Sequence, residues 1–232
     1  MLVTRKSKDR GQFNHGWLQT AHTFSFGEYQ DEHFMGFRAL RVINEDHVIG
    51  GEGFPFHDHQ NMEILTYILA GELEHKDSMG NGEVIRPGDV QYMSAGTGVT
   101  HSEFNPSKTA PVHLMQIWVL PEKKGLLPAY GQTHFSKESR TQTLKLVASR
   151  DGRDGSLKVR QDLSLYASLL GAGKSLNYEL PVERFGWLQL ASGALKINGT
   201  ELKAGDGVAI TKESKLEIAA TADSEFLFFD LA

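Results

Sequence analysis

The sequence predicts an all-β protein built from two consecutive β-barrels, and two observations support this fold class. Short apolar runs alternate with turn residues along the chain, and no long helical period interrupts them. Two segments of the second half also repeat, in the same order, the pattern of two segments of the first half. Chance could produce one such repeat, whereas two in the same order favour a duplicated barrel.

The first half contains the clearest strand signals. Alternation along residues 22–26 predicts that His22, Phe24 and Phe26 share one face of a strand. Turn residues between 77 and 82 predict the tip of a hairpin. Further strands are predicted at residues 37–43, 62–70 and 112–120.

A connector is predicted at residues 121–132, where prolines and glycines break any regular element. After it the pattern starts again: residues 187–195 repeat that of 65–73, and residues 204–210 repeat that of 87–93. We therefore predict an N-terminal barrel over residues 1–132 and a C-terminal barrel over residues 133–232.

Composition and charge exclude several classes of protein. A net charge of −5 and a pI near 6.1 argue against a basic face that binds nucleic acid. The chain has no cysteine, which excludes disulfides and thiolate metal sites and fits a reducing compartment. Its N-terminal residues lack the apolar segment of a secretory signal, and no apolar run reaches the ~18 residues that span a bilayer. We expect a cytoplasmic monomer that binds neither membranes nor, directly, nucleic acid.

Two pairs of side chains in the first half can bind a metal. His57 and His59 are two residues apart, and so are His101 and Glu103. Residues two apart on a strand point to the same face, so all four side chains can meet if the two segments are neighbouring strands of one barrel. Three imidazoles and one carboxylate suit a divalent transition metal with one or two open positions. The alternative is structural, because single histidines in half-buried sheets usually bind no metal.

The glycines around both pairs resemble the two conserved motifs of the cupin superfamily. The spacing from Gly51 to Glu63 fits the first motif without a gap, although Gly71 falls one residue later than in its usual form. The second motif departs more, with Ser94 in place of a proline and two extra residues before His101.

Within the cupins, these departures resemble the pirin family. The resemblance covers nearly the whole chain and rests on residues 14–17, 22–26, 57–59, 62–67, 77–81, 94–98, 101–103 and 154–159. It implies a bicupin of two jelly-roll-like barrels with short linker helices. It also implies one divalent metal, Fe(II) first, with Ni, Cu, Co, Mn or Zn as alternatives that such a ligand set also holds. Several members of the family have quercetin 2,3-dioxygenase activity.

In the mechanism that this resemblance implies, a flavonol binds as its enolate, dioxygen adds across the 2,3 bond and carbon monoxide is lost. Glu103 is the candidate that takes the proton, as a ligand that detaches or from beside the metal. Glu63 is the rival ligand, because alternation from His59 would turn it inward and cupins often use a glutamate there. Pirins use the glutamate of the His-x-Glu pair, which favours Glu103.

A flavonol also needs a flat apolar slot, although aromatic residues at strand spacing more often belong to a core. The candidates for this slot are Phe24, Phe26, Phe54, Phe56, Met93 and Trp118. The remaining histidines of this region, His22, His75 and His113, are expected to be hydrogen-bonded structural groups.

The second half offers no equivalent ligands. All ten histidines lie at or before His134. Counting from the matching glycines, the places of the four predicted ligands fall at Glu179, Pro181, Ile218 and Ala220. We therefore predict one metal, in the first barrel only.

Two other functions stay open. The protein could be a metal-binding regulator that acts through a protein partner, as some pirins are described. It could also be a sugar isomerase or epimerase, as other cupins are, but the sequence near the predicted ligands supplies few of the basic residues that a sugar phosphate needs.

Overall fold

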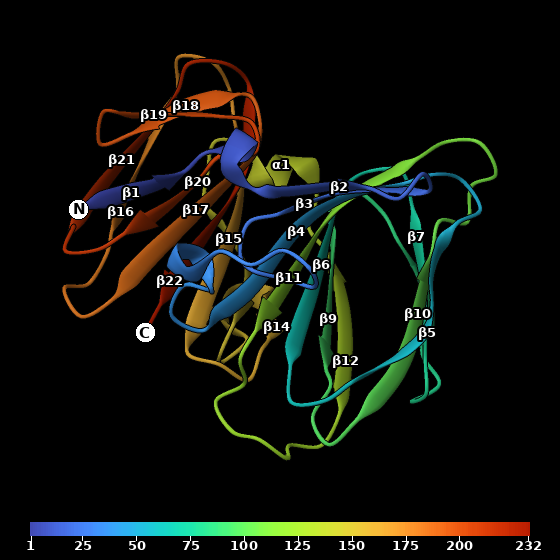
Figure 1. Cartoon of the computed structure of the whole chain (residues 1–232). Helices are drawn as coiled ribbons and strands as arrows, with labels where there is room; N and C mark the ends of the chain where they lie inside the picture. Colours follow the sequence, from blue (N-terminus) through green and yellow to red (C-terminus); the bar gives the residue numbers. More distant parts are fainter. The chain divides into compact units, whose positions relative to one another are not determined.

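The computed structural model describes all 232 residues, and strands dominate it (Figure 1). Its helical elements are one α-helix, α1 (Lys137–Arg140), and three short 3-10 turns. The chain divides into two compact units. The first barrel comprises Gly11–His134 and Val159–Gln161, and the second comprises Met1–Arg10, Phe135–Lys158 and Asp162–Ala232. The predicted all-β fold of two barrels is confirmed.

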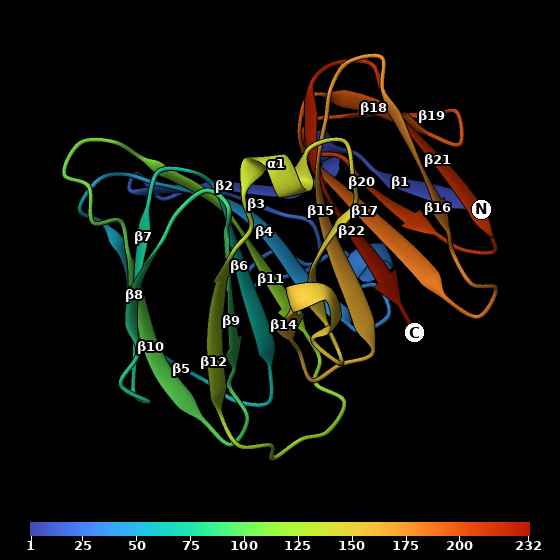
Figure 2. The same cartoon turned by 180° about the vertical axis from the view of Figure 1, so that it is seen from behind.

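Two sheets form the first barrel, and they face each other in both views (Figures 1 and 2). The larger sheet has the order β12-β9-β6-β11-β4-β3-β2, and the smaller has the order β5-β10-β7-β8. The strands are β2 (Gly11–Asn14), β3 (Leu18–His22), β4 (Leu40–Val48), β5 (Gly53–His59), β6 (Glu63–Ala70), β7 (Leu73–Asp77), β8 (Gly82–Ile85), β9 (Asp89–Ser94), β10 (Val99–Phe104), β11 (Val112–Val119) and β12 (Ala129–His134).

The second barrel repeats this arrangement. Its sheets have the orders β1-β20-β17-β22-β15-β13-β14 and β16-β21-β18-β19, which match the first barrel position by position along most of both sheets. The strands are β1 (Leu2–Arg5), β13 (Lys145–Ser149), β14 (Leu157–Lys158), β15 (Leu163–Leu170), β16 (Ser175–Glu179), β17 (Phe185–Ser192), β18 (Ala194–Ile197), β19 (Thr200–Lys203), β20 (Gly207–Ile210), β21 (Lys215–Ala220) and β22 (Ser224–Leu231).

The repeated glycines have the same backbone conformation in both barrels. Gly71 and Gly193 follow equivalent strands, β6 and β17, with φ of 79° and 84°. A β-carbon at either position would meet backbone atoms closer than 3 Å. Only glycine combines this left-handed conformation with so close an approach, so the two turns require it. This agreement supports the duplication predicted from the sequence.

Two predicted segments differ from the structure. Only His22 of residues 22–26 belongs to a strand; beyond it the chain turns, and Ser25 Oγ both donates to the Asp31 carbonyl and accepts from the Asp31 amide. The predicted connector 121–132 ends inside β12, which pairs with β9 along its length. This pairing outweighs the turn signal of Gly131, so the sequence pattern alone was misleading there.

The first ten residues belong to the second barrel. Strand β1 pairs with β20 and so takes the edge position that β12 takes beside β9 in the first barrel. The buried Asp206 carboxylate accepts hydrogen bonds from the amides of Ser7 (2.7 Å) and Lys203 (3.1 Å). Arg10 Nη1 donates to the Gly205 carbonyl at 2.9 Å. The predicted division at residues 132 and 133 stays a prediction. It assigned residues 1–10 to the N-terminal barrel and so did not include β1 in the second barrel.

The interior of the second barrel is apolar. Its two sheets enclose a cluster that includes Leu188, Leu190, Ile197, Ile210, Ile218, Phe226 and Phe228. Ile218 and Ala220, which the gap-free mapping placed at ligand positions, are buried on β21. No helix of the structure has the length and hydropathy of a membrane-spanning segment, and the cytoplasmic location stays a prediction.

We predict that Asp206→Ala destabilises the protein by about 1–3 kcal/mol, because it leaves the Ser7 and Lys203 amides without their charged acceptor. Urea denaturation followed by circular dichroism measures this loss. Glu201→Ala is the control, since Glu201 pairs with Lys196 on the surface with 70% of its side chain exposed and such pairs contribute about 0–1 kcal/mol. Equal effects of the two substitutions would contradict the anchoring role of Asp206.

Candidate metal centre

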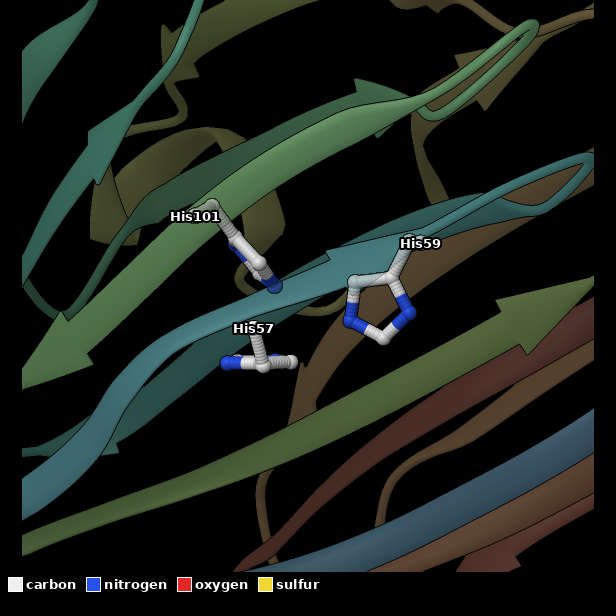
Figure 3. Close-up of side chains that lie close together, drawn as sticks. All are labelled: His57, His59 and His101. Atoms are coloured by element: carbon white, nitrogen blue, oxygen red, sulfur yellow. The ribbon is translucent and has the colours of Figure 1, made fainter.

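The pairing of β5 with β10 brings three histidines together. These strands are antiparallel neighbours, with His101 opposite His57 and Val99 opposite His59. The three rings gather on one side of the strand pair (Figure 3). Their centroids are 4.4 Å apart for His57 and His101, and 4.8 Å apart for both His59 pairs. Nitrogen atoms of the three rings lie within 4.8 Å of one another, close enough to bind one cation.

Glu103 lies next to this group rather than symmetrically within it. The register between β10 and β5 shifts between His101 and Glu103, as a β-bulge does. Glu103 forms a second group with His101 and His75, whose ligand atoms also lie within 4.8 Å of one another. The structure therefore arranges the four predicted residues as two overlapping groups that share His101.

His75 supports the shared histidine from behind. Its Nε2 lies 3.1 Å from Asp77 Oδ2, and its Nδ1 lies 3.4 Å from His101 Nδ1. The ring is fully buried and stacks on Tyr130. A carboxylate behind a histidine in this way fixes the orientation of the ring. His75 is thus hydrogen-bonded, as predicted, and it orients His101.

Several ligand atoms of the centre are buried without a hydrogen-bond partner. These atoms are Nε2 of His59, Nε2 of His101 and Oε1 of Glu103. His57 Nδ1 lies 2.8 Å from the Pro55 carbonyl, so its Nε2 is the nitrogen left for another partner. Buried polar atoms without partners cost free energy, and a cation bound among the three histidines would satisfy the two imidazole nitrogens. The donor set fits a divalent transition metal on this ground.

Burial shifts the pKa values of the centre in the directions that suit metal binding by histidine. Burial, reinforced by the neighbouring histidines, lowers the pKa of His101 to about 2. Burial and His57 lower the pKa of His59 to about 4. Both imidazoles are therefore neutral near pH 7, which is the form that binds metals. Burial raises the pKa of Glu103 to about 7, against the opposing effect of the hydrogen bond from Gln116.

A cavity of about 360 Å³ opens beside the centre. His57, His59 and Glu103 form part of its wall. Its volume falls in the range of ~300–1,000 Å³ that is typical of small-molecule sites. No lysine or arginine lines it. The other lining residues are apolar or uncharged except one aspartate and one histidine: Leu18, Thr20, His22, Phe26, Asn44, Asp46, Phe54, Pro55, Gln116 and Trp118.

Of the six residues predicted for the slot, three line the cavity and three lie elsewhere. Trp118, Phe26 and Phe54 line the cavity, and the Trp118 ring packs edge-on against His59 with centroids 4.8 Å apart. Phe56 is 65% exposed, and Met93 is buried in an apolar cluster with Ile64 and Val99. Phe24 is also a buried core residue outside the cavity.

Sequence reasoning missed the polar wall of the cavity, which includes Asn44 and Asp46. The predicted strand at residues 37–43 stopped just short of them, whereas β4 continues to Val48. The signal was present in the sequence, because Val42, Asn44, Asp46 and Val48 are alternate residues that share one face of the strand. All four are buried in the structure. Two polar residues on an otherwise apolar inward face indicate a site.

Glu63 faces a different set of partners. Its carboxylate accepts hydrogen bonds from Ser94 Oγ (2.7 Å), the Tyr92 hydroxyl and the Arg160 amide (3.2 Å). It belongs to neither metal-competent group. Alternation from His59 fails because β5 ends there and Asn61 takes a left-handed φ of 52°. Glu63 therefore anchors the returning segment Val159–Gln161 on the first barrel.

The fold and the site together define a class of protein: two barrels of matching strand order, of which the first carries a histidine-rich centre. The family model described as pirin matches residues 3–119, and the model described as quercetinase C-terminal cupin domain matches residues 146–231. The chain belongs to the pirin family, and it is a bicupin, as its resemblance to that family implied.

Relatives match this chain over nearly its full length. A quercetin 2,3-dioxygenase of Escherichia coli is 50% identical over 231 residues, covering 100% of this chain and 99% of the relative. The crystal structure of YhhW from Escherichia coli has a TM-score of 0.97 at 50% identity, covering 100% of this chain and 98% of that one. A second crystal structure, of the bacterial pirin YhhW in complex with nickel(II), has a TM-score of 0.95 at 49% identity, covering 100% and 99%.

The raised pKa of Glu103 predicts how pH affects the metal-free protein. Below pH 4.5 the carboxyl is protonated in both the folded and unfolded states, whereas between pH 4.5 and about 7 it ionises first in the unfolded state. Its contribution to folding is therefore lost as pH rises through about 7. We expect metal-free Glu103→Gln to be more stable than the wild type at pH 8 and similar to it at pH 4.5.

Thermal unfolding of chelator-treated protein at the two pH values measures this difference. Glu72→Gln is the control, because Glu72 is exposed on the same barrel and pairs only with Arg86. A stability difference between Glu103→Gln and wild type that stays the same at both pH values would contradict the prediction.

Proposed function

We propose that the first barrel is a metal-dependent dioxygenase that cleaves flavonols such as quercetin with release of carbon monoxide. The observation that carries this proposal is the set of buried, unpartnered imidazole and carboxylate atoms beside a cavity with aromatic walls. The name of the Escherichia coli relative supports it, since that protein is a quercetin 2,3-dioxygenase.

The proposed ligands are Nε2 of His57, His59 and His101, together with Oε1 of Glu103. Glu103 is preferred to Glu63, because the Glu63 carboxylate already accepts hydrogen bonds from Tyr92, Ser94 and the Arg160 amide. Fe(II) is the proposed native metal, and the nickel(II) complex of a relative makes nickel its first alternative. When bound, a divalent metal supplies positive charge, which stabilises a deprotonated substrate oxygen. It also makes dioxygen chemistry accessible.

Glu103 is the proposed base for the proton of the substrate's 3-hydroxyl, either as a ligand whose Oε1 would leave the metal or from beside the metal. It lines the cavity, its Oε1 has no other partner, and Gln116 Nε2 holds its Oε2 at 2.7 Å. A base held by one oxygen keeps the other aimed at the substrate. Loss of C3 as carbon monoxide requires oxygen at C2 and C4, so dioxygen contributes one atom to each of these carbons rather than adding across the 2,3 bond as first expected. The bonds from C3 to C2 and to C4 break, as does the O–O bond, and C3 leaves with its oxygen as carbon monoxide.

The aromatic walls suit a flat substrate. Phe26, Phe54 and Trp118 provide the apolar surfaces, and the Trp118 indole is held by its hydrogen bond to Gln116 Oε1 at 3.1 Å. A sugar phosphate would need cationic partners, and the cavity wall contains no lysine or arginine. The isomerase alternative therefore has no support from this site.

We predict that His101→Ala abolishes metal binding, because His101 belongs to both metal-competent groups. Elemental analysis after anaerobic purification should fall from about one metal per chain to a trace. His113→Ala is the control, since His113 lies outside both groups and bonds to Glu45. Full metal content in His101→Ala would refute the proposed ligand set.

We predict that Glu103→Gln lowers the turnover of quercetin by roughly 10²–10⁴-fold, the usual contribution of a positioned base. An oxygen electrode measures it, with carbon monoxide trapped as the second product. Glu63→Gln is the matched control and should keep both metal and turnover, provided that its unfolding curve shows a folded protein. A metal-loaded wild type that consumes no dioxygen with any flavonol would favour the regulator that acts through a protein partner.

A further inference from the structure

A belt of polar side chains crosses the buried face of the large sheet in the first barrel. Direct cross-strand pairing joins its members in a row: His22 to Asn44, Asn44 to Gln116, Gln116 to Thr66 and Thr66 to Gln91. The belt passes the metal centre, because Gln116 donates to Glu103. Apolar clusters flank it on both sides, with Ile64 and Met93 on one and Leu114 and Ile68 on the other.

At the cavity end of this belt, two buried polar atoms have no partner. They are Thr20 Oγ1 and Asn44 Oδ1, on residues that are 6% and 5% exposed. Both residues line the cavity, and so does the Asp46 carboxylate, which stands directly opposite Thr20 across β3 and β4. Leaving such atoms unsatisfied lowers the stability of the folded protein. A binding site that supplies their partners from a ligand explains their presence.

The chemistry of these groups selects the ligand. Two of the three, an amide oxygen and a carboxylate, accept hydrogen bonds, and the threonine hydroxyl can accept as well. An O–H donor suits all three, whereas an anion would meet the Asp46 carboxylate with no lysine or arginine in the cavity wall. The apolar part of the wall includes the aromatic rings of Phe26, Phe54 and Trp118. A phenol combines the hydroxyl donor with the flat apolar ring.

The spacing of the groups fits one rigid ligand. Asn44 is the cross-strand neighbour of Gln116, which donates a hydrogen bond to Glu103. Asn44 therefore lies at the metal end of the cavity. Thr20 and Asp46 lie one inward row further along the strands, which is about 7 Å away. A ligand held at the metal by one end therefore presents its distant ring to Thr20 and Asp46.

We propose that Thr20, Asn44 and Asp46 form a subsite for the phenolic hydroxyls of a flavonol other than its 3-hydroxyl, with Asn44 nearest the metal and Thr20 and Asp46 further along the cavity, so that the protein selects polyhydroxylated flavonols. This rests on the proposed function for the identity of the substrate, but the recognition of hydroxyl groups can be measured without turnover. A flavonol with only its 3-hydroxyl keeps the end that faces the metal and leaves the subsite unsatisfied.

The test is calorimetric titration of the full-length, zinc-loaded protein under nitrogen with quercetin and with 3-hydroxyflavone, because zinc is redox-inert. Thr20→Val and Asn44→Leu should each weaken quercetin binding about fivefold to tenfold, the value of one hydrogen bond. Both should leave the affinity for 3-hydroxyflavone unchanged. Ser168→Ala is the matched control, since it removes a buried hydroxyl without a partner in the second barrel. Should Asn44→Leu fail to fold, Thr20→Val carries the test alone.

The outcomes separate this subsite from the dioxygenase. Selective loss of quercetin affinity in this titration supports the subsite. Should the iron-loaded wild type consume no dioxygen with quercetin in the oxygen electrode, the proposed reaction fails while the subsite stands. Equal loss for both flavonols, or no loss for quercetin, overturns the subsite even where dioxygen is consumed.

Discussion

The pairing of β5 with β10 is the constraint on which the centre depends. It sets His101 opposite His57, and the register shift after His101 moves Glu103 off the direct line of the histidines. A one-residue slip would turn every one of these side chains to the other face of the sheet. The register before the bulge brings the three imidazoles together. The shift after it leaves the Glu103 carboxylate hydrogen-bonded to Gln116 and exposed to the cavity.

The first barrel accepts a buried polar belt where the second barrel has an apolar filling. In the second barrel the corresponding interior contains leucine, isoleucine and phenylalanine side chains. In the first, Gln116 links the belt to the centre by bonding Glu103 with its amide and Trp118 with its oxygen. Chains of hydrogen bonds in a low-dielectric interior hold their members in one geometry, at a cost in stability when any atom stays unsatisfied. Duplication allows this specialisation, because one barrel can be optimised for packing alone.

Much of the fold could be predicted, because its signals are local. Gly71 and Gly193 mark equivalent turns that only glycine can form, and the two-residue spacing of His57 and His59 fixes their common face. What could not be predicted depends on pairing between distant segments. β12 is a strand only because β9 pairs with it, and His75 joins the centre only because β7 pairs with β10. Glu63 turned away because one left-handed residue, Asn61, breaks the alternation.

The place of β1 has a consequence for how the chain is made. The strand that completes the large sheet of the second barrel is made before the whole first barrel, and its partner β20 follows some two hundred residues later. Until then it exposes an unpaired edge, the kind of surface on which chains aggregate or swap segments. Such distant closure is slow to form. The first barrel can close before the second, because the second needs β20, which is made after the first barrel.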